Sequence, residues 1–174
     1  MFELKDYQLA ALAALGNFLL ATRTKSIPEA FAGVIAVQGR SEPYREIFEG
    51  VPSLCLRVPT GGGKTLLAAH SIALAGKTLL DIDAPVALWL TPSDTIRTQT
   101  LEALSNARHP YRQALAESFG DRVRVCDLDS LQTISPLDVG RNCIVVVATI
   151  QAFNVSDTAK RNVYSFFEEL APHF

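Results

Sequence analysis

The chain has 174 residues, of which 48% are hydrophobic and 20% charged. This length and apolar fraction fit one domain with a sizeable core, and they exclude disordered and low-complexity classes. Sixteen basic residues against eighteen acidic ones give a formal net charge of −2. No overall basic field is present, so any contact with nucleic acid must be local.

The cysteines and the N-terminus indicate the cellular compartment. Cys55, Cys126 and Cys143 stand in apolar, strand-like runs and form no Cys-x-x-Cys pair. We therefore expect neither a disulfide framework nor a zinc site, and each thiol should behave as a small hydrophobe. The chain starts without a signal-peptide pattern, and no apolar run approaches the ~18 residues that span a bilayer. These features predict a cytoplasmic protein without membrane contact.

The first third of the chain is predicted to hold one helix and one insertion. Apolar residues recur at three- and four-residue steps over residues 4–22, which predicts a helix. Glycine and proline interrupt residues 25–52, where we expect an insertion with a short strand at 34–37 and a short helix at 43–48. A further strand is expected at 54–58.

Helices and strands alternate in the rest of the chain. We expect helices over residues 64–75, 94–106, 111–119 and 158–170, and strands over residues 86–90, 123–126 and 144–148. The strand at 144–148 is β-branched and apolar on both faces, as central parallel strands are. The alternation predicts an α/β fold with a parallel β-sheet flanked by helices and right-handed crossovers.

A glycine-rich segment, Val-Pro-Thr-Gly-Gly-Gly-Lys-Thr at residues 58–65, lies between an expected strand and an expected helix. Glycine lets backbone N–H groups approach phosphate oxygens closely, and a helix N-terminus adds further donors. Lys64 can reach the β- and γ-phosphates, and Thr65 offers a hydroxyl to Mg²⁺. The segment predicts a nucleotide site with Lys64 as its catalytic cation, made of Pro59, Thr60, Gly61, Gly62, Gly63, Lys64 and Thr65.

Four ordered motifs resemble those of a known family. Val58 replaces the first glycine of the strict G-x-x-x-x-G-K-[ST] pattern, so the loop suits the helicase variant A-x-x-G-x-G-K-[ST]. Residues 4–8 resemble an "L-R-x-Y-Q" motif, residues 88–93 with Gln99 resemble motif Ia, and residues 146–153 resemble motif Ib. Together they resemble the first motor domain of superfamily-two helicases, closest to the restriction-type DEAD/DEAH-box group that includes type III restriction subunits.

This resemblance implies a RecA-like, ATP-dependent DNA helicase or translocase that uses Mg²⁺. Gln8 would read the adenine edge, and a nucleic-acid backbone would be held by Thr91, Pro92, Ser93, Gln99, Thr149 and Gln151. Plainer explanations stay open from the residues alone: a surface glutamine on an amphipathic helix, an N-cap at Ser93 or Asp94, and a capped turn after the last strand. Only the restriction-type resemblance favours DNA over RNA. Arg97, Arg108 and Arg112 form either a basic strip or a solvated helix face.

The family's second motif, Asp-Glu-x-His, has no match, because no Asp-Glu pair occurs in the sequence. Asp127 is the one aspartate that directly follows an apolar strand, but Leu128 stands where the glutamate is required. We therefore expect residues 1–174 to be the N-terminal part of an incomplete first RecA-like domain, with a second RecA-like domain in the C-terminal remainder. Such a part would bind ATP without hydrolysing it steadily. The alternatives are a P-loop phosphotransferase or NTPase that does not act on nucleic acid, and a non-catalytic nucleotide-binding module.

Overall fold

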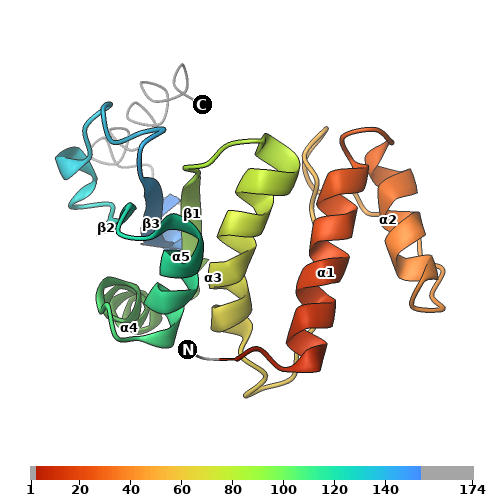
Figure 1. The fold of residues 1–174 in the computed structure, drawn as a ribbon, viewed down its shortest axis with the longest axis horizontal. Helices are drawn as coiled ribbons and strands as arrows, with labels where there is room; N and C mark the ends of the chain where they lie inside the picture. The colour runs from red at the N-terminus through yellow and green to blue at the C-terminus, as the bar shows by residue number, and fades with distance from the viewer. Residues whose placement is uncertain (1–2, 154–174) are drawn as a thin grey trace. The chain divides into compact units, whose positions relative to one another are not determined.

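The computed structural model describes residues 3–153 (Figure 1). The chain divides into two compact units, Met1–Asp81 and Ile82–Phe174, called here the N-terminal and the C-terminal unit. The helix expected at 158–170 lies outside the described residues. Within those residues, no helix combines the length and the apolar character that crossing a membrane requires.

The N-terminal unit is built of helices. It contains α1 (Asp6–Ala21), α2 (Ile27–Ala36), α3 (Lys64–Ala75) and a π-helical turn, η1 (Gly76–Leu80), that continues α3. In Figure 1, α2 and α3 lie on either side of α1. Their core is centred on Phe18, Leu19 and Ala30. The helices expected at 4–22 and 64–75 are therefore confirmed.

The predictions for the insertion were wrong. Residues 34–37, expected as a strand, belong mostly to α2, and residues 43–48 form no helix. A capping box between Ser26 and Glu29, with Pro28 in the first turn, starts α2. Val34 then packs against the Phe18 core, so its β-branched side chain serves a helix. Tertiary packing has overridden the local strand preference.

The strand expected at 54–58 is also absent. A strand needs a neighbouring strand to satisfy its backbone N–H and C=O groups, and the described residues of the N-terminal unit contain no named strand. Leu54 instead packs against the helical core, while Cys55 is exposed. Cys126 and Cys143 are buried, as small hydrophobes usually are, whereas the exposed Cys55 does not fit that expectation.

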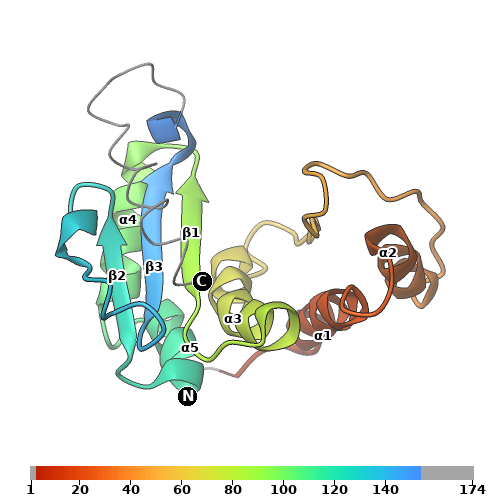
Figure 2. The same cartoon turned by 90° about the horizontal axis from the view of Figure 1, so that it is seen from above.

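The C-terminal unit contains a three-stranded parallel sheet in the order β1-β3-β2 (Figure 2). Its strands are β1 (Val86–Thr91), β2 (Val123–Asp127) and β3 (Cys143–Thr149). The central strand β3 is buried along almost its whole length, as expected for an apolar strand covered on both faces. All three strands were predicted within one or two residues of their ends.

Helices α4 (Asp94–Ser105) and α5 (Pro110–Phe119) pack against one face of this sheet (Figure 2). Ser93 caps α4 and His109 caps α5, where Pro110 occupies the first turn. Two short 3₁₀ turns, η2 (Leu131–Thr133) and η3 (Ile150–Phe153), follow β2 and β3. The α/β fold predicted from the alternation, a parallel sheet flanked by helices, is thus confirmed.

Candidate functional site

The three consecutive glycines of residues 58–65 meet two requirements of the loop, one of backbone conformation and one of space. Gly61 and Gly63 have φ angles of +76° and +80°, a region that side chains rarely enter. Gly62 has an ordinary φ but no room, because a Cβ there would lie 2.6 Å from Val58 Cγ1 and 2.9 Å from the Pro59 carbonyl oxygen. All three positions therefore disfavour a side chain, as in the glycine-rich loops that bind phosphate through backbone N–H groups.

Lys64 and Thr65 begin α3 directly after this loop. The exposed Lys64 ammonium donates to the carbonyl oxygens of Val58 (3.2 Å) and Pro59 (3.1 Å), so the side chain bends back over the loop. Thr65 is half-buried in the first turn of the helix. A cation, a hydroxyl and a helix N-terminus thus stand beside one glycine-rich loop, and these groups fit a nucleotide triphosphate with its Mg²⁺.

Tyr7 and Gln8, in the first turn of α1, contact the same loop. The Tyr7 hydroxyl and the Gln8 Nε2 each donate to the Gly62 carbonyl oxygen at 3.0 Å. Gln8 Oε1 accepts from the backbone N–H of Lys5 at 2.9 Å, which closes a capping box at the start of α1. Gln8 is 5% exposed, so the interpretation as a surface glutamine was wrong. The structure brings the "L-R-x-Y-Q" segment and the phosphate loop together.

In the C-terminal unit, the turns after β1 and β3 are joined at one edge of the sheet. Thr91 pairs with Thr149 in the strand register and is 2% exposed; its hydroxyl donates to the Ala148 carbonyl oxygen at 3.2 Å. Gln151 Nε2 donates to the Pro92 carbonyl oxygen at 3.3 Å. Two of the residues proposed to touch a nucleic-acid backbone thus make internal contacts, Thr91 between the ends of β1 and β3 and Gln151 between the turns that follow them.

The remaining residues of this predicted set lie near the same turns. Ser93 accepts from the Ile96 N–H at 3.4 Å, so the predicted N-cap is confirmed at Ser93. Pro92, Ser93 and Gln99 are exposed, and Thr149 is half-buried. Pro92 and Ser93 directly follow β1 and Thr149 ends β3, whereas Gln99 lies within α4.

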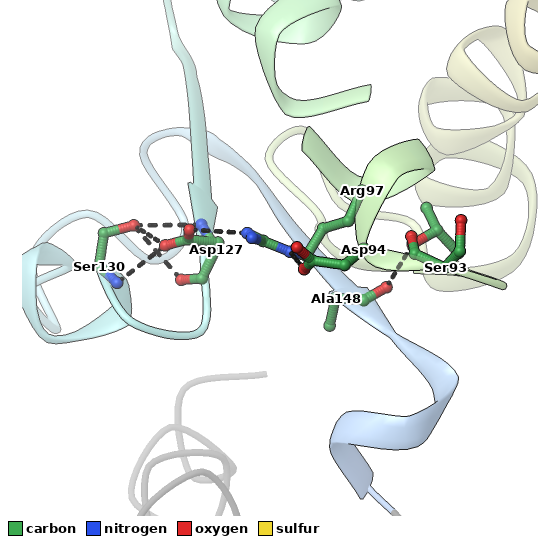
Figure 3. A network of polar contacts seen from close by, with 7 residues as sticks. Ser93, Asp94, Arg97, Asp127, Ser130 and Ala148 are labelled. Carbon is green, nitrogen blue, oxygen red and sulfur yellow. Dashed lines mark hydrogen bonds and ion pairs between the residues drawn. The ribbon is translucent and has the colours of Figure 1, made fainter. Parts of the chain in front are cut away.

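Asp127, the last residue of β2, is held by a polar network (Figure 3). Its carboxylate accepts from Arg97 Nη1 at 3.0 Å, from the Ser130 N–H at 3.0 Å and from the Ser130 hydroxyl. The hydrogen bonds from the Ser130 hydroxyl and then from the Ser130 backbone N–H, followed by the Arg97 charge, hold the pKa of Asp127 below its ordinary value. This carboxylate is therefore ionised and already bound within the protein.

Arg97 is shared between two carboxylates. Its Nε donates to Asp94 Oδ1 at 2.7 Å, one helical turn away on α4, in addition to its contact with Asp127. The hydrogen bond to Asp94 raises the pKa of Arg97. Arg97 was one of three arginines, with Arg108 and Arg112, that could form a basic strip. Its charge is neutralised by the two carboxylates.

Residues 3–153 contain no cluster of three His, Cys, Asp or Glu side chains that could hold a metal ion. Thr65 was the one residue predicted for Mg²⁺, and phosphate oxygens would supply most of the remaining coordination there. Two features were missed from the sequence: the contact of Tyr7 with Gly62, and the crowding that excludes a side chain at Gly62. The run of three glycines in the sequence could have indicated the crowding at Gly62.

A parallel α/β sheet flanked by helices, together with a glycine-rich loop that opens a helix, defines an incomplete RecA-like domain of the P-loop class. The family model for the type III restriction enzyme res subunit matches residues 1–170, and the chain belongs to this family. No curated protein and no solved structure is significantly similar to the chain. The predicted resemblance to the restriction-type helicase motor is confirmed, and family membership implies an ATP-dependent, helicase-like motor domain that interacts with nucleic acid.

Proposed function

We propose that this chain is the ATP-binding part of an ATP-dependent DNA helicase or translocase of the restriction-enzyme type. The observation that carries the proposal is the loop of Gly61, Gly62 and Gly63 that opens α3 with Lys64. Left-handed φ angles at two glycines and crowding at the third keep side chains out of the space where backbone N–H groups would meet phosphate oxygens.

In this proposal the phosphates of ATP lie against residues 59–63 and the N-terminus of α3. Lys64 transfers its hydrogen bonds from the Val58 and Pro59 carbonyl oxygens to the β- and γ-phosphates, and Thr65 offers its hydroxyl to Mg²⁺. When bound, Mg²⁺ neutralises charge that develops on the transferred phosphoryl group. Gln8 contributes to the same site through its contact with the loop.

The nucleic-acid contacts are proposed for the turns after β1 and β3. The exposed residues Pro92, Ser93 and Gln99, with the half-buried Thr149, would contact the nucleic-acid backbone. Thr91 and Gln151 would hold the ends of the two strands and their turns together. DNA is the proposed track because the family is that of a restriction enzyme. The contacts are few, and Arg97 is already paired with Asp94 and Asp127, so we expect weak binding with a shallow salt dependence.

Steady hydrolysis would need groups from elsewhere in the protein. The sequence has no Asp-Glu pair, and Asp127 is bound to Arg97 and Ser130. We therefore propose that residues 1–174 bind ATP without turning it over, and that the C-terminal remainder with a second RecA-like domain supplies the acid and the arginine finger. An arginine finger alone contributes about 10³–10⁵ in rate in P-loop enzymes.

The test is ATP binding by the chain in the presence of Mg²⁺, measured by calorimetry on the wild type and on Lys64→Ala. A hydrogen bond to a charged group contributes about 1.5–3 kcal/mol, so Lys64→Ala should bind ATP with an affinity roughly 10- to 150-fold lower than the wild type. Lys77→Ala is the matched control, because Lys77 is an exposed lysine of the same unit outside the loop. Equal ATP affinity in wild type and Lys64→Ala would refute the assignment of the loop.

A further inference from the structure

We propose that Tyr7 is a positioning residue of the phosphate loop. Its hydroxyl, together with the amide of Gln8, holds the Gly62 carbonyl and thereby orients the N–H of Gly63 toward the bound phosphates. The inference rests on the proposed function, since it concerns the same nucleotide site, and it assigns that site a residue outside the loop motif.

The argument starts from the geometry of one peptide unit. None of the peptide bonds in the described residues is cis, and in a trans unit the C=O and the following N–H point in opposite directions. The Gly62 oxygen accepts from Tyr7 and Gln8, both at 3.0 Å, so both of its lone pairs are engaged on the side of α1. The Gly63 N–H must then point away from α1, to the side of the loop where the proposed function places the phosphates.

The surrounding contacts hold this orientation. The Gly62 N–H donates to the Pro59 carbonyl oxygen at 3.0 Å, which fixes the preceding peptide unit as a turn. A Cβ at Gly63 would lie 2.5 Å from Gln8 Nε2, so α1 packs directly on the backbone here. Glycine peptides rotate easily because no side chain restricts them. Outside contacts are therefore needed to keep a Gly-Gly peptide in one orientation, and Tyr7 and Gln8 provide them.

The contacts of Gln8 lead to a distinct expectation about nucleotide choice. Its Oε1 is engaged with the Lys5 N–H, and its Nε2 with the Gly62 carbonyl. A group that acts through the loop affects every ligand carrying the same phosphates, whatever the base. A group that reads adenine affects ATP alone. The base dependence of the loss therefore separates the two roles.

The experiment compares wild type with Tyr7→Phe, which removes the hydroxyl and keeps the ring. Affinities for ATP, GTP and inorganic tripolyphosphate, each with Mg²⁺, are measured by calorimetry, and the unfolding temperature is measured without ligand. Loss of one neutral hydrogen bond should weaken all three ligands by a similar factor, about fivefold. Tyr44→Phe is the matched control, because the Tyr44 hydroxyl accepts from the Ser53 N–H in the same unit, away from the loop.

Each outcome decides the matter. A common loss for the three ligands with an unchanged unfolding temperature supports the positioning role. Unchanged affinities with a lower unfolding temperature would show that Tyr7 only stabilises the fold, and a loss confined to ATP would show that it serves adenine; either result overturns the inference alone. If wild type binds none of the three ligands, the proposed function fails, and this inference fails with it.

Discussion

Arg97 on α4 donates from Nη1 to Oδ2 of Asp127, 3.0 Å away at the end of β2. This ion pair and the Ser130 hydrogen bonds join the helix after motif Ia to the turn after β2. Both side chains are less than a quarter exposed, so water screens the pair only in part. The aspartate considered for the missing Asp-Glu-x-His motif therefore has a structural partner.

Asp127→Asn should lower the free energy of unfolding by about 1.5–3 kcal/mol at pH 7. The substitution removes a charged hydrogen bond, while the Arg97 side chain stays mostly buried. Urea unfolding measures this difference. Asp129→Asn, two residues away and exposed, is the control and should change the stability by less than about 0.5 kcal/mol. An equal effect of both substitutions would refute a specific role of the pair.

The same pair predicts a pH dependence. The pKa of Asp127 in the folded chain lies below the ordinary value of 3.8, so folding favours the ionised carboxylate. Its contribution is complete above that ordinary value and is lost as the pH falls through the lower, folded-state pKa. The stability difference between wild type and Asp127→Asn should therefore be largest near neutrality and shrink below about pH 4. A difference that grows on acidification would contradict this assignment.

The loop glycines should not tolerate even a methyl group. Gly62→Ala brings a Cβ to 2.6 Å from Val58 Cγ1, so we expect a loss of about 1–3 kcal/mol of stability together with weaker nucleotide binding. Gly33→Ala is the matched control: no atom lies within 4 Å of the added Cβ, and alanine suits a helix better than glycine. That control should be neutral or slightly stabilising by thermal unfolding.

A double variant separates the two causes of crowding at Gly62. Val58→Ala removes the side chain that a Cβ would meet, but the Pro59 carbonyl oxygen remains 2.9 Å away. Val58→Ala/Gly62→Ala should therefore recover part of the stability lost in Gly62→Ala, and a double-mutant cycle gives the coupling. Strict additivity of the two changes would show that Val58 is not the obstacle.

The sequence predicted those helices and strands for which local preference and tertiary packing favour the same structure. Helix α3 starts and ends where the pattern placed it, because glycine stands before Lys64 and an Ala- and Leu-rich run follows. Strand β3 was predicted as central from an apolar, β-branched run, and such a run is stable only when both faces are covered. In these segments local preference and tertiary packing agree.

The secondary structure was predicted wrongly where tertiary contacts decide between two locally possible conformations. Val34 has strand propensity, but as part of a helix it packs against the core cluster of Phe18, Leu19 and Ala30. Residues 54–58 have a strand-like pattern and no strand beside them in their unit. The Tyr7 contact joins residues 55 positions apart, a distance over which neither periodicity nor a motif carries information. Motif matching found the loop, whereas its support from α1 needed coordinates.

Thiol reactivity should distinguish Cys55 from the other two cysteines. Burial raises the pKa of Cys126 to about 11 and that of Cys143 to about 12, and both are enclosed by the sheet core. A pKa of about 11 in place of 9.0 alone lowers the reactive thiolate population at neutral pH by roughly 100-fold. A thiol-specific reagent should therefore modify Cys55 at once and the other two after unfolding.

Cys55→Ser is the control for that measurement, because it should abolish the fast reaction and leave the slow one intact. Cys55 is exposed, so the substitution should change the unfolding free energy by less than about 0.5 kcal/mol. Rapid modification of two or more thiols in the native wild type would contradict the burial of β2 and β3 described above.

Ser93 offers a test of the nucleic-acid surface that leaves the fold intact. Its side chain caps α4, and aspartate and asparagine cap helices about as well as serine does. Ser93→Asp places a negative charge where a DNA phosphate is proposed to lie, whereas Ser93→Asn keeps the cap without the charge. Binding of a labelled oligonucleotide, titrated at several salt concentrations, should be several-fold weaker in Ser93→Asp at low salt. The difference should fade as salt screens it. Equal affinities of the two variants at low salt would place the DNA backbone away from this turn.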